Sequence, residues 1–354
     1  MSDTNQPERI IIRCPNWVGD VAMATPALRC VRESFPKTHI TIVLRAPLLN
    51  ILEGTPWFDE ALIIESATGL RSAISMLILA RALRKKPFDL GLLLTNSFNS
   101  ALLFRLAGVR RRVGYSRDGR DFLLSEAAPR ASKDGKFLPT YTGDTFLTLC
   151  ERVGCTIRDR RLELFTTEAD ERRADEIYAK NGIDSSRPEV IVNPGASYGS
   201  SKLWAPERFA WVADRLVEKH GCAILICGSS AERALGERIK ALMESPALLL
   251  QDCGVPFDLG VLKSLVKRCA LMLTLDSGPR HFAVAFGRPA VTLMGPNSPL
   301  YTATPLEGGE VVRVDVECGP CQLKECPTDR RCMTGITPEM ALAACERQLK
   351  TLNA

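Results

Sequence analysis

The sequence predicts an α/β protein of two domains, each a largely parallel β-sheet with helices on both faces. Apolar runs of strand length alternate with segments whose apolar residues recur at helical spacing, and this layout occurs in both halves of the chain. Polar or glycine-rich loops follow several of these strands. The 354 residues are also enough for two domains that each bury a core.

The first predicted domain covers residues 1–166. Its first strand, Ile10–Cys14, precedes a helical segment at Val21–Phe35. We place the linker near Thr166, after a short strand at Leu162–Phe165. The remaining predicted strands and helices of this half are Ile40–Leu44, Leu70–Leu83 (helix), Ala61–Ile64, Leu90–Leu94, Ala101–Ala107 (helix) and Thr145–Val153 (helix).

The second predicted domain covers residues 167–336 and repeats the alternation. No Gly-x-Gly-x-x-Gly follows the first strand of the chain, which is evidence against a dinucleotide-binding oxidoreductase. The predicted strands are Val190–Val192, Ala223–Cys227, Leu271–Leu275 and Ala290–Met294, and the predicted helices are Glu168–Asn181, Pro206–Lys219, Ala231–Met243, Asp258–Cys269 and Pro279–Phe286. A last predicted helix, Thr337–Leu352, follows this domain.

Composition is that of an ordinary globular protein with a formal net charge of +5, which argues neither for nor against nucleic acid. The polar N-terminus contains no hydrophobic signal region, and no apolar run is long enough to cross a bilayer. We therefore expect a cytoplasmic protein. The thirteen cysteines then suggest small core residues and not a disulfide scaffold.

A tight turn, Asp276-Ser277-Gly278, lies between a buried strand and the helix that Pro279 begins. Free backbone N–H groups and the positive end of a helix dipole favour a phosphate at such a position. Gly278 allows close approach, Ser277 adds a hydroxyl, and the nearby His281 is a candidate donor. An ordinary capped turn, with His281 as a half-buried helix residue, is the alternative.

Two further loops should reach the same sheet edge. Residues 193–204 form a Gly/Ser-rich loop that contains Lys202 but lacks the Walker spacing. Lys202 is either an exposed lysine or, beside the Asp276 turn, a phosphate ligand. Glu232 begins a helix after the next strand, where it either suits the helix dipole or accepts a hydrogen bond from a ribose hydroxyl.

In the first half, Gly19-Asp20 lies on the first strand-to-helix loop, and Asn96 and Ser97 follow a later strand. Loops at the carboxyl ends of strands line the ligand crevice of an open α/β sheet. Asp20 could accept a proton from a sugar hydroxyl, or it could only cap its helix. Asn96 or Ser97 could likewise be no more than an N-cap.

Basic residues gather in the first half, where they form either a solvated face or a surface for a phosphorylated glycolipid or an acidic membrane leaflet. They are Arg81, Arg84, Lys85, Lys86, Arg105, Arg110, Arg111, Arg112, Arg117 and Arg120.

Five motifs, in this order along the chain, resemble glycosyltransferase family 9, most closely its ADP-heptose:lipopolysaccharide heptosyltransferase II branch. They are Pro-x-Trp-Val-Gly-Asp at Pro15–Asp20, Asn-Ser-Phe-x-Ser-Ala-Leu at Asn96–Leu102, Pro-Gly-Ala…Lys-x-Trp at Pro194–Trp204, Asp-Ser-Gly-x-x-His at Asp276–His281 and Gly-Pro-x-Ser-Pro…Thr at Gly295–Thr302.

The resemblance implies a GT-B architecture, in which two Rossmann-like domains face each other across a cleft and the last helix, 337–354, packs back on the N-terminal domain. It assigns the acceptor to the first domain, with Trp17, Asn96 and Ser97, and the nucleotide sugar to the second. Asp20 would be the general base. The donor would be held by Lys202, Glu232, Asp276, Ser277, Gly278 and His281.

The implied reaction is inverting transfer of a heptose from ADP-L-glycero-D-manno-heptose to the first heptose of the lipopolysaccharide inner core, on a heptosyl-Kdo2-lipid A type acceptor. No Asp-x-Asp motif is evident, so we expect no metal or other cofactor. We also expect no nucleic-acid partner and peripheral contact with the cytoplasmic face of the inner membrane. Another family 9 enzyme, of heptosyltransferase I or III type, and a nucleotide-sugar epimerase of GT-B fold are the alternatives.

Four C-terminal cysteines, Cys318, Cys321, Cys326 and Cys332, have ligand-like spacing. Four thiolates could hold zinc or an iron–sulfur cluster. We favour the other interpretation, reduced thiols in a loop.

Overall fold

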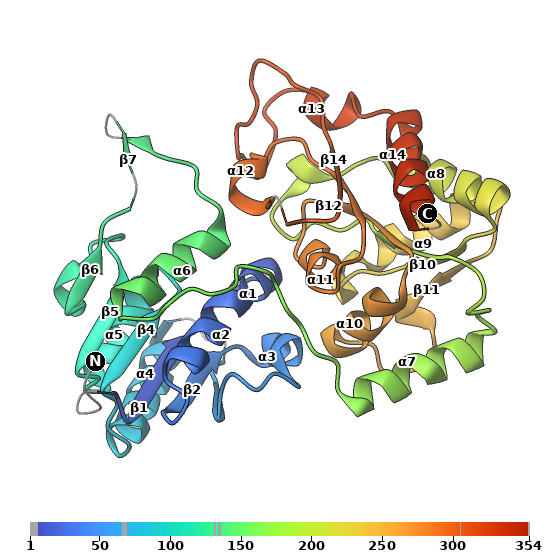
Figure 1. Cartoon of the computed structure of the whole chain (residues 1–354). Helices are drawn as coiled ribbons and strands as arrows, with labels where there is room; N and C mark the ends of the chain where they lie inside the picture. The colour runs from blue at the N-terminus through green and yellow to red at the C-terminus, as the bar shows by residue number, and fades with distance from the viewer. Residues whose placement is uncertain (1–5, 66–68, 131, 134–135, 305, 353–354) are drawn as a thin grey trace. The chain divides into compact units, whose positions relative to one another are not determined.

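The computed structural model describes residues 6–65, 69–130, 132–133, 136–304 and 306–352 (Figure 1). The chain divides into two compact units, Met1–Glu163 and Leu164–Ala354. The division lies just before the expected linker near Thr166. The predicted strand at Leu162–Phe165 is wrong, because this segment is irregular and passes from one unit to the other.

The first unit is built on a six-stranded parallel sheet with the order β3-β2-β1-β4-β5-β6. Ile10, Ile11 and Ile12 of its central strand β1 are completely buried, as expected when helices cover both faces of a sheet. The strands are β1 Arg9–Arg13, β2 His39–Leu44, β3 Glu60–Ile63, β4 Leu90–Leu93, β5 Arg111–Tyr115 and β6 Glu126–Ala128, and a small antiparallel pair, β7 Ser132–Lys133 and β8 Lys136–Phe137, follows.

The helices of the first unit are α1 Val18–Met23, α2 Thr25–Ser34, α3 Ala46–Leu52, α4 Gly69–Arg84, α5 Phe98–Leu106 and α6 Thr142–Arg152, with a 3-10 turn at Asp121–Leu123. The single helix predicted at Val21–Phe35 is two helices. Pro26 lies in the first turn of α2, where a helix tolerates a residue without a backbone N–H. The same residue cannot continue α1, because it has no N–H to donate within that helix. The Thr25 hydroxyl donates to the Ala22 carbonyl at 2.8 Å and helps to end α1.

The second unit repeats the strand order as β11-β10-β9-β12-β13-β14, again entirely parallel. Its strands are β9 Glu189–Asn193, β10 Ala223–Ile226, β11 Ala247–Leu249, β12 Leu271–Leu275, β13 Ala290–Leu293 and β14 Gly309–Val312. Its helices are α7 Glu168–Asn181, α8 Pro206–His220, α9 Arg233–Leu242, α10 Leu259–Arg268, α11 Arg280–Ala285, α12 Pro299–Thr302, α13 Arg331–Thr334 and α14 Pro338–Leu352, with 3-10 turns at Ser200–Lys202, Ser230–Glu232 and Leu250–Asp252.

The last helix, α14, packs against α8, β12, β13 and β14 of the second unit (Figure 1). Its start is fixed where the Trp204 indole N–H donates to the Ile336 carbonyl at 2.9 Å. The resemblance implies that this helix packs on the N-terminal domain, whereas its contacts with α8 and three strands place it in the second unit. Residues 353–354 of the expected helix lie outside the described residues.

Both sheets are doubly wound, as predicted, and share the Rossmann strand order. The direction of winding reverses between β1 and β4 in the first sheet and between β9 and β12 in the second. Loops that leave the carboxyl ends of the two strands diverge at such a point, which is where open α/β sheets bind ligands. Asp20 and Asn96 follow β1 and β4 at the first of these edges, and Lys202 and Asp276 follow β9 and β12 at the second.

Candidate active site

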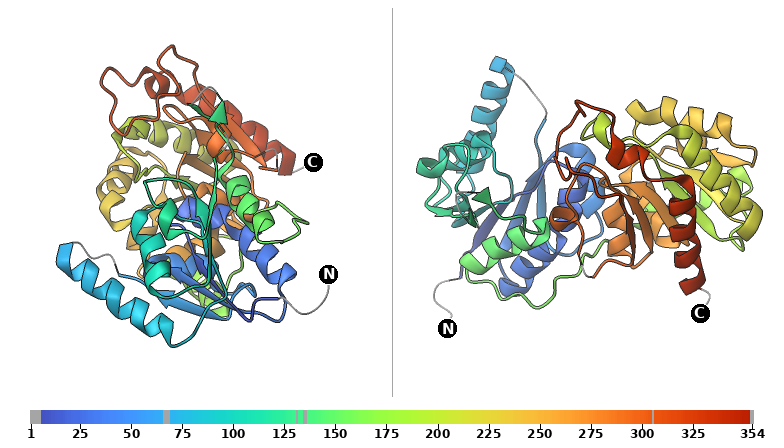
Figure 2. Two further views of the ribbon diagram at one scale, coloured as in Figure 1. Left: turned by 90° about the vertical axis from the view of Figure 1, so that its left-hand side faces the viewer. Right: turned by 90° about the horizontal axis from the view of Figure 1, so that it is seen from above.

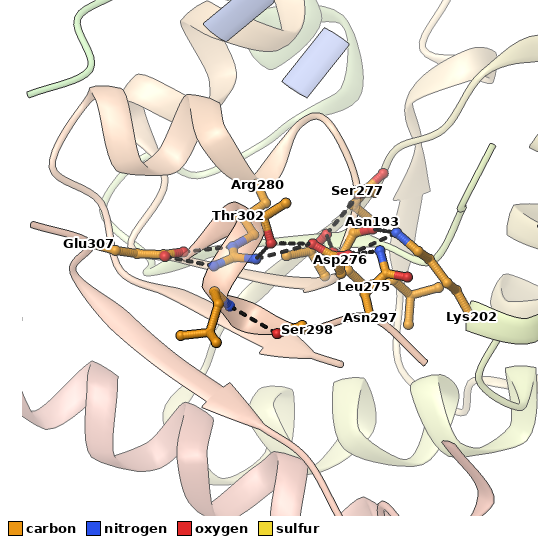
Figure 3. Close-up of polar contacts among 12 residues, drawn as sticks. Asn193, Lys202, Leu275, Asp276, Ser277, Arg280, Asn297, Ser298, Thr302 and Glu307 are labelled. Atoms are coloured by element: carbon orange, nitrogen blue, oxygen red, sulfur yellow. Dashed lines mark hydrogen bonds and ion pairs between the residues drawn. The ribbon is translucent and has the colours of Figure 1, made fainter. Parts of the chain in front are cut away.

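The loops that follow β9 and β12 begin side by side, because Asn193 of β9 is paired in register with Thr274 of β12. The Asn193 side chain donates to the Thr274 hydroxyl at 2.9 Å and to the Ser277 hydroxyl at 2.6 Å (Figure 3). Asn193 thereby fixes the position of Ser277 at the sheet edge. Sequence reasoning missed Asn193; its only signal was a polar residue at the end of an apolar strand.

Lys202 reaches the same edge from the 3-10 turn in the loop after β9. Its Nζ lies 2.8 Å from Oδ2 of Asp276 and 2.8 Å from the Asp276 carbonyl oxygen (Figure 3). Both side chains are buried, and the Lys202 Nζ also lies 4.9 Å from the centre of the Tyr198 ring. An ammonium has three N–H donors, so these contacts leave one for a ligand. The structure therefore brings Lys202 and the Asp276 turn together.

Asp276 is the centre of a buried hydrogen-bond network. Oδ2 accepts from Lys202 and, at 2.7 Å, from Asn297; Oδ1 accepts from Thr302 at 3.1 Å and from Arg280 at 3.2 Å. Burial alone would raise the pKa of Asp276, but the charges of Lys202 and Arg280 outweigh burial and lower it to about 2. Both carboxylate oxygens already accept two hydrogen bonds each. Asp276 therefore holds other residues in position and has little capacity left to bind a nucleotide sugar directly.

Arg280 extends this network to Glu307. Its Nε and Nη2 atoms each lie 2.6 Å from a Glu307 carboxylate oxygen, which is the bidentate geometry of a strong Arg–carboxylate pair (Figure 3). The Arg280 side chain is wholly buried. Neither residue was predicted, because in a sequence a buried ion pair separated by 27 residues looks the same as two solvated charges.

The turn itself offers hydrogen-bond donors. Within the described part of the chain, the backbone N–H groups of Ser277 and Gly278 have no acceptor. Two unpaired N–H groups beside the Lys202 ammonium form a site suited to an anion such as a diphosphate. The four nearby charges, Lys202 and Arg280 against Asp276 and Glu307, sum to zero. The site therefore attracts an anion by oriented donors more than by net charge.

His281 follows Arg280 and is buried. Burial and the charge of Arg280 lower the pKa of His281 to about 3, so its imidazole is neutral at physiological pH. A neutral imidazole keeps one N–H to donate but adds no positive charge.

Glu232 lies at the same carboxyl edge, after β10. Its Oε2 accepts from the Ser229 N–H at 2.8 Å and the Ser229 hydroxyl at 2.7 Å, which closes a capping box. The carboxylate also lies against Gly195, where an added Cβ would come within 2.2 Å of it. Glu232 thus caps the start of the helical segment that leads into α9, and its Oε1 has no hydrogen-bond partner among the residues that the structure describes.

The cysteine-rich segment packs against the Lys202 loop. The Ser201 hydroxyl donates to the Leu323 carbonyl at 2.5 Å, and the Ser201 N–H donates to Lys324 at 3.0 Å. Cys318, Cys321, Cys326 and Cys332 are free thiols. No group of three or more His, Cys, Asp or Glu side chains suited to a metal occurs among the described residues. The segment thus supports the loop that carries Lys202.

Asp20 lies in the first turn of α1, just after the central strand of the first sheet. Its carboxylate forms no hydrogen bond or ion pair with any residue that the structure describes. Asp20 therefore does not cap its helix through its side chain. Burial raises the pKa of Asp20 to about 6, which is a suitable value for a general base near neutral pH.

Arg13 holds the segment that leads to Asp20. This buried guanidinium donates to the Cys14 carbonyl at 2.5 Å, the Val43 carbonyl at 3.0 Å and the Asn16 side chain at 2.6 Å. The next residue, Trp17, is 54 % exposed. A fixed loop that presents an exposed indole three residues before a carboxylate is suited to a sugar ring.

Asn96 and Ser97 follow β4, the strand beside β1 at the switch point. Ser97 caps α5 by accepting from the Ser100 N–H at 3.4 Å, which leaves its own hydroxyl hydrogen to donate. The completely buried Arg120 donates to Oδ1 of Asn96 at 3.3 Å and to the Thr95 carbonyl at 2.6 Å. The Asn96 side-chain N–H groups have no hydrogen-bond partner among the described residues.

The arginine-rich stretch is only partly a charged surface. Arg112 and Arg120 are buried, and both donate to backbone carbonyls. Arg110 pairs with Asp89, and Arg111 pairs with Glu126. Among the described residues, no helix combines the length and the apolar character needed to cross a bilayer.

Comparison with known families gives this arrangement a class. The sequence model of glycosyltransferase family 9 (heptosyltransferase) matches residues 76–331. The chain therefore belongs to glycosyltransferase family 9 and is a glycosyltransferase. The two Rossmann-like units are those of the predicted GT-B fold class.

Individual relatives within the family are heptosyltransferases of type 2. The chain is 28 % identical over 313 residues to lipopolysaccharide heptosyltransferase 2 of Escherichia coli (strain K12), covering 86 % of this chain and 88 % of the relative. It is 25 % identical over 338 residues to lipooligosaccharide heptosyltransferase 2 of Haemophilus influenzae, covering 94 % and 97 %.

Two solved structures of family 9 proteins have a similar fold. The structure of E. coli ADP-heptose lps heptosyltransferase II superimposes with a TM-score of 0.76 at 25 % identity, covering 98 % of this chain and 100 % of that one. A family 9 glycosyltransferase from Veillonella parvula reaches a TM-score of 0.83 at 22 % identity, with 97 % of each chain covered, and shows the fold alone.

Proposed function

We propose that this glycosyltransferase moves a heptose from ADP-L-glycero-D-manno-heptose to the first heptose of the lipopolysaccharide inner core. The relatives named above are heptosyltransferases of type 2, and they are matched over most of their length. The observation that carries the proposal is the convergence of Lys202, Asp276 and the Ser277-Gly278 N–H groups at the switch point of the second sheet.

The donor's diphosphate would bind these N–H groups and the remaining N–H of Lys202. When the bond to the anomeric carbon breaks, the leaving ADP gains negative charge, and fixed donors stabilise it without reorganising. Each such donor is worth about 3–4 kcal/mol in the transition state. Glu232 would accept from a ribose hydroxyl, and the neutral His281 would donate from its ring.

The acceptor would bind the first unit at the switch point beside Asp20. Trp17 would stack on a sugar face, while Asn96 and Ser97 would hydrogen-bond its hydroxyls. Asp20 would take the proton of the attacking hydroxyl as its oxygen forms the new bond on the face opposite the leaving ADP, which inverts the anomeric configuration. Because no residue that the structure describes pairs with the Asp20 carboxylate, the carboxylate is available for that proton.

The reaction would need no metal ion or other cofactor, because Lys202 and the backbone donors can take the charge of the leaving group. The partners would be ADP-heptose and a heptosyl-Kdo2-lipid A type glycolipid, met at the cytoplasmic face of the inner membrane by a peripheral contact, without nucleic acid.

The test is a donor and acceptor matrix with purified protein. Heptosyl-Kdo2-lipid A and Kdo2-lipid A are each offered with ADP-heptose, ADP-glucose and UDP-glucose, and products are read by mass spectrometry and ADP release. The proposal expects one added heptose only with ADP-heptose and the heptosylated acceptor. Transfer to Kdo2-lipid A would indicate a type I enzyme instead, and conversion of the donor without any acceptor would indicate an epimerase.

A further inference from the structure

Helix α4 carries a row of large apolar side chains that the described residues of the first unit leave at least half exposed. Ile74, Leu77 and Ile78 are 50 %, 55 % and 66 % exposed. In both views of Figure 2 the N-terminal half of α4 extends beyond the other elements of its unit, whereas its C-terminal half joins the core through Ala80 and Leu83. A helix of this length draws most of its stability from packing, so an uncovered apolar half indicates a partner.

The exposed residues form one face. Relative to Ile74, residues four, seven and eleven positions on return to the same side of a helix, which brings Ile78, Arg81 and Lys85 into line with it. Leu77 and Arg71 flank this line. The opposite side holds the residues that pack into the unit, Met76, Leu79, Ala80 and Leu83. The helix is thus amphipathic in an unusual sense, because its outward face is apolar in the middle and cationic toward its ends.

The charge on this face has one sign. No Asp or Glu occurs between Glu65 and Asp89. Arg71, Arg81 and Lys85 are exposed and form no ion pair with any residue that the structure describes. Lys86 pairs with Glu60, and Arg84 donates to the Leu106 carbonyl, so these two are engaged within the unit. An apolar strip between unpaired cations is the pattern of a helix that lies in the headgroup region of an anionic bilayer.

The position of this half-helix in the fold relates it to the acceptor. A helix that connects parallel strands runs against them, so α4, which follows β3, begins at the carboxyl edge of the sheet and ends near the amino edge. Asp20 and Asn96 lie at that same carboxyl edge. Phe98 and Phe122, 39 % and 72 % exposed with ring centres 6.0 Å apart, add apolar surface there.

We propose that Ile74, Leu77 and Ile78 of α4, with Arg71, Arg81 and Lys85, dock the first unit on an anionic phospholipid surface, so that a membrane-embedded acceptor enters beside Asp20. This inference rests on the proposed function for the identity of the acceptor but not for the docking itself. A second copy of the chain is the less favourable occupant, because two such faces would oppose three unpaired cations to three.

The experiment measures vesicle binding and activity separately. The full-length protein is sedimented with vesicles of phosphatidylcholine alone or of phosphatidylcholine mixed with phosphatidylglycerol. We expect binding to the mixed vesicles only. Replacing Arg81 and Lys85 by Gln should weaken it about five-fold per charge, from about 1 kcal/mol each. Ile74→Ser/Leu77→Ser/Ile78→Ser should abolish it.

The matched control is Lys240→Gln/Leu242→Ser, which removes an exposed cation and an exposed leucine from α9 of the second unit and should leave binding unchanged. Transfer to an acceptor presented in mixed vesicles should fall in parallel with binding, while transfer to a de-acylated acceptor in solution should not change.

Equal sedimentation of the triple-serine variant and the wild type would overturn the proposal, as would equal binding to neutral vesicles. Loss of a wild-type dimer in the triple variant, with vesicle binding intact, would identify the face as a contact between copies and also overturn it. If transfer fails with every acceptor while vesicle binding follows the expected pattern, the proposed function fails and the docking surface stands.

Discussion

The Lys202 ammonium and the Asp276 carboxylate, 74 residues apart in the chain, meet at 2.8 Å in a buried site at the switch point of the second sheet. The contact exists because β9 and β12 are neighbours, so that the loops after them leave the sheet together. Asp276 both positions the Lys202 ammonium and neutralises its charge. Mutations can separate the effect of this pair on ligand binding from its effect on stability.

Lys202→Met should weaken ADP binding and lower stability, because Asp276 loses a partner while it stays buried. Removing one member of a buried pair costs about 3–5 kcal/mol, and the three remaining partners of Asp276 should keep the loss at the lower end or below it. Titration calorimetry with ADP and denaturant unfolding measure the two effects.

The double variant Lys202→Met/Asp276→Asn should recover much of the stability but not the affinity for ADP. If affinity returns with stability, Lys202 is a structural residue and contacts no phosphate.

Asp20→Asn should lower kcat by about 100-fold to 10,000-fold, the usual range for a general acid or base, and leave the dissociation constant of ADP within two-fold, or about 0.4 kcal/mol. Glu33→Gln, which removes an exposed carboxylate from α2 of the same unit, is the matched control. Single-turnover rates with both variants decide the matter, and a kcat of Asp20→Asn close to wild type excludes Asp20 as the base.

The rate should rise with pH through the pKa of Asp20, which burial raises to about 6. A general base works only when it is deprotonated, so log kcat should climb with a slope near one below that pKa and level off above it. A profile of kcat from acid to neutral pH, with the stability of the protein checked at each point, shows whether the limb is present. A flat profile through this range contradicts the assignment.

Asp20 should also cost stability at neutral pH. Its folded pKa of about 6 lies above the ordinary value of 3.8, so the folded state binds the proton more tightly and its stability falls as pH rises between these values. Asp20→Asn should therefore raise the free energy of unfolding by about 1–3 kcal/mol above pH 6 and change it little near pH 4. Urea unfolding at the two pH values measures the difference, and equal gains at both refute the linkage.

Chelation should leave transfer unaffected, because oriented donors and Lys202 are proposed to stabilise the leaving ADP. Initial rates with and without EDTA, and again with added Mg²⁺, test this expectation. Metal analysis of the same samples should find less than one zinc or iron per chain. A chelator-sensitive rate that magnesium restores contradicts the metal-free mechanism, and stoichiometric zinc would revive the cysteine site.

The doubly wound layout was predictable because apolar residues recur with a different period in strands and in helices, and because the two kinds of segment differ in length. The misses have physical causes. The interior strand β5 Arg111–Tyr115 and the edge strand β14 Gly309–Val312 contain too many polar residues and glycines to show an apolar run in the sequence. The irregular segment Leu162–Phe165 has the apolar alternation of a strand but pairs with none.

The loop residues of the site were also predictable, because they follow recognisable strands. Their partners were not. Asn193, Arg280 and Glu307 owe their importance to contacts between elements that only the folded chain brings together. Arg120 was grouped with the basic surface residues for a related reason. A sequence does not distinguish a wholly buried guanidinium from a fully solvated one.

Arg120 has a consequence for engineering. Its guanidinium donates to the Tyr115 carbonyl at the end of β5 and to the Thr95 and Ser97 carbonyls after β4. These hydrogen bonds hold the loop after β4 and the loop after β5 together. A graft that imports a relative's residues 94–100 alone keeps the backbone carbonyls but can remove the Asn96 and Ser100 side-chain acceptors of this buried cation, whereas a graft that also carries 115–121 brings the residue that the relative places opposite them. Acceptor preference in this enzyme should therefore be exchanged as a cassette of both loops.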